Sequence, residues 1–476
     1  MKQAWPISWK RRRNPHVLCD GIRPLLSAVF LLLFTACSLD SAVAEGWKAA
    51  AAKATITPPQ GMWMSGYASR THGAEGTLHD IWAKALVLED AQGHRSVIVT
   101  LDLVGIDRQL SENVCRLLKE KHGFSRDQVA LCTSHTHTGP VVGGNLAAMY
   151  FLNKTQQRMV DDYAAKLPGR VNQAVSDALA ALAPATLSEG IGKATFAVNR
   201  RNNPEKEVPR LREEGKLLGP FDHDVPVLAV RDEAGRLKAI LFGYACHATT
   251  LSFYQWSGDY PGFAQIDLES AHPGAIALFW AGCGADQNPL PRRTVKLSQS
   301  YGSRLAKAVN KVLAGDMPPV ASELKTRYAL IDLPFDTLPT RAELERQAKS
   351  DNRYEASLAK ILLQQIDDGE PLSQTYPYPV EVWRLGKNLL WVTLGGEVVV
   401  DYALRLKTEL GERTTWVAGY SNDVMAYIPS RRVLVEGGYE GGGAMVYYGL
   451  PSHWAPQVEK LIVDEVHRQA KALAAE

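Results

Sequence analysis

Hydrophobic positions recur along the chain in two spacings, and each spacing predicts a different kind of element. Short runs of β-branched and other apolar residues, bounded by Gly, Asp or Pro, predict strands. These runs lie at 85–90, 96–103, 128–135, 225–230, 275–283 and 389–396. Apolar residues at helical spacing predict helices at 111–121, 170–183, 298–314, 398–410 and 456–475, and a capping box at 340–343 opens a helix over 340–367. Because the strands are apolar almost throughout, we expect an α/β fold of mixed β-sheets covered by helices.

No linker interrupts this pattern, so one large domain is expected. The segment 199–221 is polar and rich in turn residues, which predicts a long loop or lid. The 476 residues carry 53 Lys and Arg against 51 Asp and Glu, and these charges are interspersed. Such a balance lacks the basic footprint of a nucleic-acid-binding protein, so no nucleic-acid partner is expected. The sequence does not indicate an oligomeric state.

The N-terminus has the pattern of an export signal. A basic stretch at 9–15 precedes an apolar run at 25–37, and Ala42-Val43-Ala44 supplies a cleavage site of small residues. We therefore expect residues 1–44 to be a signal peptide and 45–476 to be the mature domain, periplasmic or secreted. Processing as a lipoprotein at Cys37 is the alternative.

The mature chain has four cysteines: Cys115, Cys132, Cys246 and Cys283. Their spacing fits no C-x-x-C motif, and we expect buried thiols, although an exported chain permits disulfides.

Polar residues that suit a metal follow several of the apolar runs. In LCTSHTHTGP (131–140), His135 and His137 alternate on an extended chain, which directs both imidazoles to one face. Such a pair suits a metal or proton handling. His247 follows the apolar run AILFGYAC, and Glu397 follows Gly395-Gly396. Two histidines and a carboxylate are a common catalytic zinc set. The alternatives are a hydrogen-bonded core histidine and a carboxylate at a helix N-terminus.

Six segments of the chain occur in the order found in the neutral/alkaline non-lysosomal ceramidases, a family that the sequence resembles. The segments are SHTHTGP, VNRRNNP, CHATT, SGDYPGFA, LGGE and SNDVMAYIPS, and the similarity runs from about Ala52 to about Tyr448. The resemblance implies a zinc amidase that acts on a small-molecule or lipid N-acyl substrate. It implies His135, His247, Glu397 and Tyr427 as metal ligands. It also implies catalytic roles for His137, which would move protons, for Arg200 near the reaction centre, and for Asp286. A lipid substrate leaves transient contact with a membrane surface open.

Two departures from the family pattern affect the expected substrate and domain content. The family has a Gly-Asp-x-Ser-Pro-Asn loop, whereas residues 282–289 read GCGADQNP and contain no serine. The chain also ends soon after residues 447–449, so we expect a catalytic domain without the family's C-terminal immunoglobulin-like domain. A zinc hydrolase of another amide or ester, or a non-catalytic exported binding protein, therefore stay as alternatives.

Further residues near the site have two interpretations each. Asp259 either orients a ligand histidine or belongs to a turn. Backbone N–H groups around Gly282–Gly284, or Arg200, are candidates to stabilise an oxyanion. Three aromatic residues either line an acyl pocket or belong to the core: Trp63, Trp256 and Tyr260.

Overall fold

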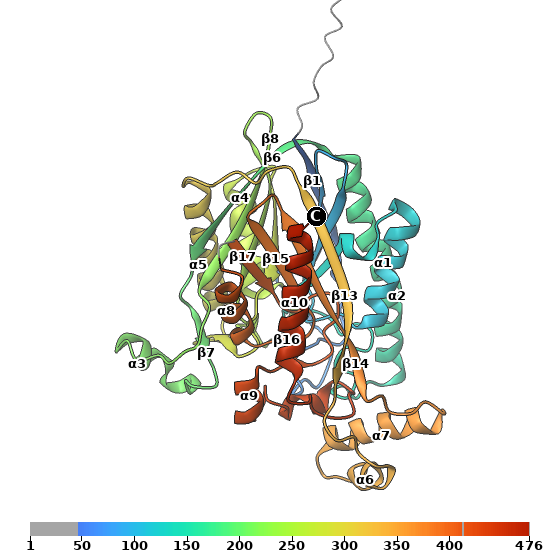
Figure 1. The fold of residues 1–476 in the computed structure, drawn as a ribbon. Coiled ribbons are helices and arrows are strands. Elements are labelled where there is room, and N and C mark those ends of the chain that lie inside the picture. The colour runs from blue at the N-terminus through green and yellow to red at the C-terminus, as the bar shows by residue number, and fades with distance from the viewer. Residues whose placement is uncertain (1–45, 412–413, 476) are drawn as a thin grey trace, which may run out of the picture. The chain divides into compact units, whose positions relative to one another are not determined.

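Two mixed β-sheets form the framework of the protein in a computed structural model that describes residues 46–411 and 414–475 (Figure 1). The larger sheet has eight strands in the order β11-β9-β8-β6-β1-β3-β4-β5. Its strands are β1 (Trp47–Thr55), β3 (Trp82–Glu89), β4 (Arg95–Leu101), β5 (Val129–Thr133), β6 (Ala183–Lys193), β8 (Asp224–Asp232), β9 (Leu237–Tyr244) and β11 (Ile276–Ala281). The pairs β4–β5 and β9–β11 are parallel, and the other pairs are antiparallel.

The smaller sheet has the order β13-β14-β15-β17, with one parallel pair, β15–β17. Its strands are β13 (Leu324–Pro334), β14 (Thr375–Leu385), β15 (Leu389–Leu394) and β17 (Thr414–Ala418). Three two-stranded pairs complete the strands: β2 (Gly76–Thr77) with β10 (Gln255–Trp256), β7 (Ala197–Asn199) with β12 (Gln287–Pro289), and β16 (Glu397–Val398) with β18 (Tyr427–Ile428).

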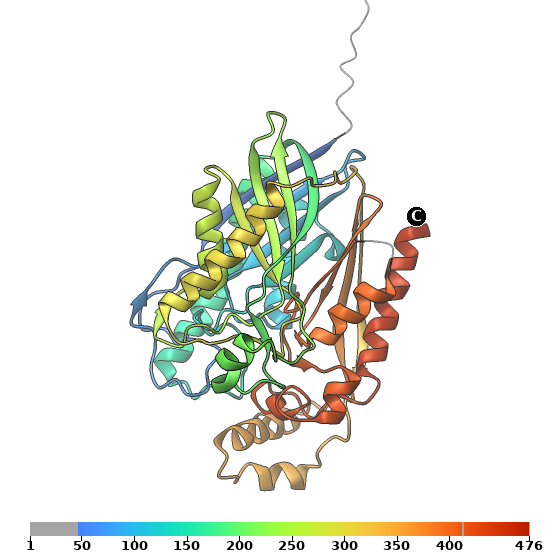
Figure 2. The same cartoon turned by 90° about the vertical axis from the view of Figure 1, so that its left-hand side faces the viewer.

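The described helices lie outside the two sheets (Figures 1 and 2). They are α1 (Arg108–His122), α2 (Lys154–Ala180), α3 (Val208–Glu213), α4 (Asp259–Ala271), α5 (Val295–Leu313), α6 (Arg341–Gln347), α7 (Arg353–Asp367), α8 (Val400–Glu409), α9 (Arg431–Glu436) and α10 (Val458–Ala475). Helices α2 and α5 pack on the larger sheet, whereas α10 packs on β13 and β14. In Figure 2 the yellow α5 and the red α10 accordingly lie on opposite sides of the two sheets.

The inner faces of the two sheets pack against each other. Trp280 of β11 contacts Trp391 of β15 and Trp416 of β17, with ring centroids 6.0 and 6.4 Å apart. Each sheet is therefore covered by helices on one face and by the other sheet on the opposite face. This double burial explains the nearly continuous apolar strands, and the prediction of mixed sheets covered by helices is confirmed.

Most predicted elements are present, with corrected bounds. The helix predicted at 170–183 is the C-terminal part of the longer α2, which begins after the N-cap residue Asn153. The helix predicted over 340–367 is two helices, α6 and α7. The capping box of Thr340 and Glu343 opens α6 as predicted, and Asn352 caps a separate α7. The predicted loop at 199–221 contains the short helix α3.

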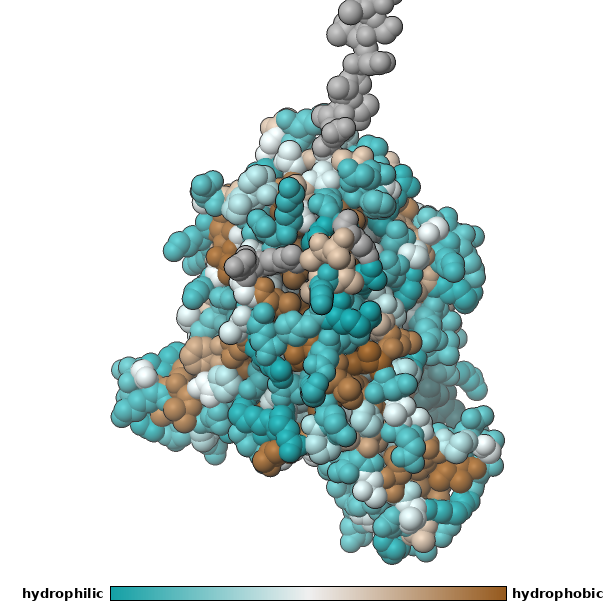
Figure 3. Space-filling model, in the orientation of Figure 1, coloured by the Kyte–Doolittle hydropathy of each residue, from teal (hydrophilic) through white to brown (hydrophobic). Residues whose placement is uncertain are grey.

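The four cysteines of the mature chain are buried and unpaired, as expected. The predicted signal peptide and Cys37 lie outside the described residues. Within the described segments, no helix has the length and apolar character needed to cross a membrane. Figure 3 shows a face on which hydrophilic residues predominate and hydrophobic ones form separate small areas.

Candidate metal centre

His135 and His247 approach each other from the ends of two buried strands. His135 follows β5, and its positive φ of 57° turns the chain directly after the strand. His247 follows β9. A parallel bridge between Thr136 and Ala248 joins the two strand ends. The larger sheet thus fixes the backbone on both sides of the imidazoles.

Glu397 and Tyr427 are direct partners in the small parallel pair β16–β18. Gly396, with a φ of 73°, places Glu397 there. A Cβ at Gly396 would lie 2.6 Å from Ile428 Cγ1 and 2.7 Å from Ala426 O, so a side chain does not fit. The strand pair carries a carboxylate and a phenol to the two histidines.

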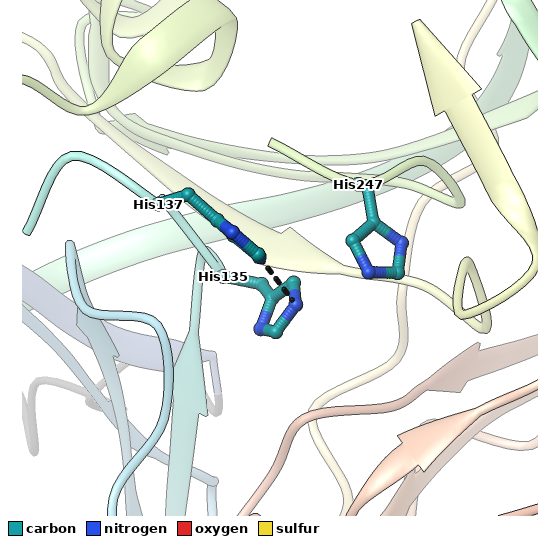
Figure 4. A group of neighbouring side chains, drawn as sticks. All are labelled: His135, His137 and His247. Atoms are coloured by element: carbon teal, nitrogen blue, oxygen red, sulfur yellow. Dashed lines mark hydrogen bonds between the residues drawn. The ribbon is translucent and has the colours of Figure 1, made fainter. Parts of the chain in front are cut away.

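The four predicted ligands and His137 converge in one place. Nε2 of His135 and Nε2 of His247 each lie 3.2 Å from Oε2 of Glu397. The Tyr427 hydroxyl lies 3.3 Å from His247 Nε2, and His137 Nε2 lies 3.1 Å from His135 Nε2. Figure 4 shows the three imidazole rings turned toward a common space.

Backbone carbonyls determine which ring nitrogens carry protons. Nδ1 of His135 lies 2.5 Å from Val104 O, and Nδ1 of His247 lies 2.7 Å from Gly284 O. Only an N–H can bond a carbonyl oxygen, so each Nδ1 donates. In the neutral rings, each Nε2 then presents a lone pair toward Glu397. This is the arrangement by which proteins orient metal-binding histidines.

Glu397 occupies the centre as a buried carboxylate. Its Oε1 accepts a hydrogen bond from the Tyr448 hydroxyl. Its Oε2 has no hydrogen-bond donor among the described residues. A buried anionic oxygen without a donor is costly, and a cation satisfies it.

The donor set fits zinc. Around a tetrahedral zinc ion with bonds of about 2.0–2.2 Å, ligand atoms lie roughly 3.3–3.6 Å from one another. The separations of 3.2 and 3.3 Å among His135, His247, Glu397 and Tyr427 are close to this range. Burial also lowers the pKa of His247 to about 4, with a further decrease from Arg200, so its ring is neutral and its lone pair free to bind a metal.

Arg200 contacts the centre through Tyr427. Its Nη2 donates to the Tyr427 hydroxyl at 3.1 Å, and its Nε donates to Glu440 at 2.7 Å. Burial lowers the pKa of Arg200, but Tyr427 and Glu440 raise it well above its ordinary value, so the guanidinium is charged. The cavity of about 430 Å³ beside the centre is lined by Arg200, His137, His247 and Tyr427, among others.

Asp286 is buried behind this cavity. Its Oδ1 accepts from Val400 N at the start of α8, and its Oδ2 accepts from Asn199 beside Arg200, both at 2.9 Å. Burial raises the pKa of Asp286 to about 6. Its contacts hold the segments that carry Arg200 and Glu397, and its catalytic role stays a prediction.

The loop at 282–289 also faces inward. Gln287 is buried, and its Nε2 donates to Ala245 O at 2.7 Å. Gly282 N donates to Tyr244 O at 3.0 Å, so this N–H is already satisfied and is not available to an oxyanion. This loop supplies the Gly284 carbonyl that orients the His247 ring, the Gln287 carbonyl that accepts from His247 N at 2.9 Å, and Asn288, which lines the cavity.

Asp259 and two of the three aromatic residues have structural roles. Asp259 is the first residue of α4, and its carboxylate accepts from Tyr260 N of the same helix, from Leu251 N of a neighbouring loop, and from Ser298 Oγ. Trp256 and Tyr260 are fully buried core residues, and Trp63 packs half-buried against the cluster around Trp256. These findings support the turn and core interpretations.

Sequence reasoning missed two residues at the centre, Tyr448 and Gly66. The Tyr448 phenol reaches Glu397 from the last third of the chain, and no local pattern marks it. Gly66 has a φ of 88°, and a Cβ there would lie 2.4 Å from His137 Nδ1. A glycine in the segment GMWMSGY is the only signal that the sequence offers.

Comparison with known proteins identifies related chains. The family model described as neutral/alkaline non-lysosomal ceramidase, N-terminal, matches residues 48–321. The neutral ceramidase of Pseudomonas aeruginosa is 26% identical over 311 residues, which cover 59% of this chain and 43% of that relative. The neutral ceramidase of Drosophila pseudoobscura pseudoobscura is 24% identical over 274 residues, covering 54% and 38%. The match therefore spans less than half the length of these curated relatives.

Solved structures show the same fold. The crystal structure of the P. aeruginosa neutral ceramidase aligns with a TM-score of 0.69 at 22% identity, covering 90% of this chain and 75% of that chain. A structure of a ceramidase complexed with C2 aligns with a TM-score of 0.65 at 20% identity, covering 88% and 74%. The two-sheet arrangement is thus shared beyond the segment matched by the family model.

Proposed function

Because the chain belongs to the neutral/alkaline non-lysosomal ceramidase family, we propose that it is an exported zinc-dependent amidohydrolase that cleaves an N-acyl, ceramide-like amide. Residues 45–476 form the hydrolase domain in this proposal, and residues 1–44 form the signal peptide. One observation carries the proposal: two imidazole Nε2 atoms lie 3.2 Å from a buried carboxylate oxygen that has no donor among the described residues.

His135, His247, Glu397 and Tyr427 would hold the zinc ion. A zinc ion held there would lower the pKa of a water molecule and polarise the scissile carbonyl. Tyr427 is oriented by Arg200, whose guanidinium donates to the phenol oxygen. Arg200 also adds positive charge where the carbonyl oxygen becomes negative during attack.

His137 is suited to move the proton. Burial lowers its pKa well below the usual value, so the ring is neutral and ready to accept a proton from the attacking water. It borders the cavity and lies 3.1 Å from His135 Nε2. The same ring can return the proton to the leaving amine, which completes a general base and general acid sequence.

Hydrolysis of another amide or of an ester is the second candidate function. The loop at 282–289 favours it, because Gln287 is buried and engaged with Ala245 O, and no serine is present in this loop. Hydrolysis by an activated water molecule and His137 does not require the serine that the family has in this loop. The loop therefore bears on the substrate and leaves the hydrolytic centre in place.

The proposal is tested by metal analysis of the purified mature protein, combined with hydrolysis of acyl amides and esters. We expect about one zinc per chain, activity that a chelator removes and zinc restores, and loss of both in His135→Ala. His122→Ala is the matched control, since His122 lies on α1 and bonds Asn172. Absence of bound zinc at low micromolar metal would overturn the proposal. Bound zinc with no turnover of any amide or ester would instead indicate a non-catalytic binding protein.

A further inference from the structure

The cavity beside the metal centre has an unusually charged wall for an enzyme of neutral lipids. Five charged side chains line it: Arg200, Arg201, Arg292, Glu205 and Glu440. Hydrogen-bonding side chains fill much of the remaining wall, among them Asn203, Thr249 and Asn288. Of the described residues that line the cavity, Leu290 is the only aliphatic one. Three tyrosines, Tyr67, Tyr427 and Tyr439, also line the cavity, so its wall combines apolar ring surface that suits an acyl chain with charged groups that a purely apolar substrate would not need.

The lining charges do not balance. Glu440 is shared by two arginines, since it accepts from Arg200 Nε and from Arg201 Nη1, both at 2.7 Å. Glu205 pairs with Arg292 at 2.8 Å. Three guanidinium groups therefore face two carboxylates. Arg201 also contacts Glu436, but that carboxylate lies outside the lining and pairs with Arg432 as well.

The metal centre increases the excess. Arg293, whose guanidinium lies 5.5 Å from the ring centroid of the lining residue Tyr67, and Glu436 both lie outside the lining, and their opposite charges cancel in this count. In the proposed zinc form, the two positive charges of the ion exceed the one negative charge of Glu397. A positive cavity with low-dielectric walls concentrates anions and favours their binding.

We propose that the substrate is an N-acyl amino acid, whose carboxylate lies beside the scissile amide and faces the arginines of the cavity. This inference rests on the proposed hydrolase function and narrows its substrate class. Water attacks the amide carbonyl, a C–O bond forms and the C–N bond breaks. The products are a carboxylic acid and a free amino acid, and the leaving nitrogen takes up one proton.

Two substrates of similar size, one anionic and one neutral, test the inference. N-octanoylglycine and N-(2-hydroxyethyl)octanamide carry the same acyl chain on a carboxylate and on a neutral alcohol, and N-octanoylsphingosine represents a neutral lipid. We expect kcat/KM for N-octanoylglycine to exceed both others at least roughly tenfold at low ionic strength, with the preference shrinking as salt is added. Equal turnover, or preference for a neutral amide, overturns the inference but leaves the hydrolase proposal standing.

Failure of the hydrolase proposal is distinguishable, because none of the three amides would then be hydrolysed. If none of the amides is hydrolysed, thermal stabilisation by N-octanoylglycine is compared with that by the neutral amide. Selective stabilisation by the acid then supports an anion site without hydrolysis, and equal or absent stabilisation overturns the anion site too.

One ion pair offers an internal control for structural damage. Arg292→Gln and Glu205→Gln both remove the same salt bridge, but they change the cavity charge in opposite directions. We expect the acid-to-neutral ratio of kcat/KM to fall roughly three- to tenfold in Arg292→Gln and to rise in Glu205→Gln. Arg116→Gln and Glu120→Gln remove an exposed pair on α1 and should leave the ratio unchanged. A shift in the same direction in both cavity variants would mean that structure, and not charge, sets the ratio, and would refute the inference.

Discussion

Nε2 of His135 and Nε2 of His247 both lie 3.2 Å from the same oxygen atom, Oε2 of Glu397. The two Nδ1 atoms donate to Val104 O and Gly284 O, so neutral rings direct lone pairs at a carboxylate. Without a cation, three buried hydrogen-bond acceptors face one another: the two Nε2 atoms and Oε2 of Glu397. The centre is therefore a place where metal binding and folding stability are coupled.

Metal removal is expected to destabilise the protein. A ligand that binds only the folded state adds about 2.7 kcal/mol at 100 times its Kd, so zinc should raise Tm and a chelator should lower it. Glu397→Gln removes the negative charge while keeping the shape, and its Tm should respond weakly to zinc. Glu409→Gln, on the exposed end of α8, should respond like the wild type. An equal response to zinc in all three proteins would place the metal elsewhere.

His135 and His137 are expected to fail in different ways when they are replaced. His135→Ala should lose zinc, because its Nε2 faces Glu397. His137→Ala should keep about one zinc per chain and lose roughly 10²–10⁴-fold in kcat, which is the usual contribution of a general base. Metal content and single-turnover rates measure the two losses separately. A metal-free His137→Ala protein would make His137 a ligand instead.

Local patterns predicted the elements well where one physical cause dominates. In the larger sheet, β3, β4 and β5 are buried on both faces, so their apolar runs are plain and all three were predicted. The strands β1 and β6 of the same sheet are partly exposed and were not predicted. The strand β13 was not predicted, because most of its side chains are partly exposed and polar residues interrupt its apolar positions.

The residues of the candidate site also fall into two groups: those that a local sequence pattern predicts and those that depend on contacts between distant segments. His135 and His137 were predicted from one short segment, since their spacing on an extended chain has a direct geometric meaning. Glu397 and Tyr427 depend on the pairing of β16 with β18, which no local spacing reveals, and Tyr427 came from family resemblance alone. Tyr448 was missed because its single contact with Glu397 joins segments that only the packed core brings together.

Tyr448 is expected to hold Glu397 in its ligand position. Its hydroxyl donates to Oε1, which leaves Oε2 for the metal. Tyr448→Phe should weaken zinc affinity roughly 10- to 100-fold, as is usual when the hydrogen-bond partner of a metal ligand is lost. Tyr447→Phe removes a phenol from the adjacent residue, which packs on Tyr354 and Tyr439. Competition with a zinc-binding dye measures both affinities, and equal affinities would contradict this role.

Gly66 and Gly61 form a matched pair for testing the position of His137. Their φ values are nearly the same, 88° and 87°, so alanine at either site carries similar backbone strain of about 1–2 kcal/mol. A Cβ at Gly66 would lie 2.4 Å from His137 Nδ1, whereas nothing lies within 4 Å at Gly61. Gly66→Ala should therefore lower kcat as His137→Ala does and keep its zinc. Gly61→Ala should show only the loss of stability. Similar kcat values in the two variants would show that the ring position is not critical.

Glu381 should make folding stability depend on pH through a link to the strand that carries His135. Its Oε2 accepts from Asn422 Nδ2 at 2.8 Å, and Asn422 Oδ1 in turn accepts from Leu131 N of β5 at 3.0 Å. Burial raises the pKa of Glu381 to about 7 from an ordinary value of 4.5, despite opposing effects of Arg126 and its hydrogen bonds. The folded state therefore holds a proton that the unfolded state releases at lower pH.

The sign of the effect follows from this difference in proton binding. The stabilisation from the protonated carboxyl is complete below pH 4.5 and is lost as pH rises through about 7. The loss amounts to about 3 kcal/mol. Glu381→Gln cannot titrate, so the unfolding free energy of the wild type minus that of the variant should fall by this amount between pH 4.5 and 8. Urea unfolding at several pH values measures the difference, and its slope does not depend on how glutamine itself packs. A constant difference for Glu381→Gln would mean that folding does not raise the pKa of this carboxyl.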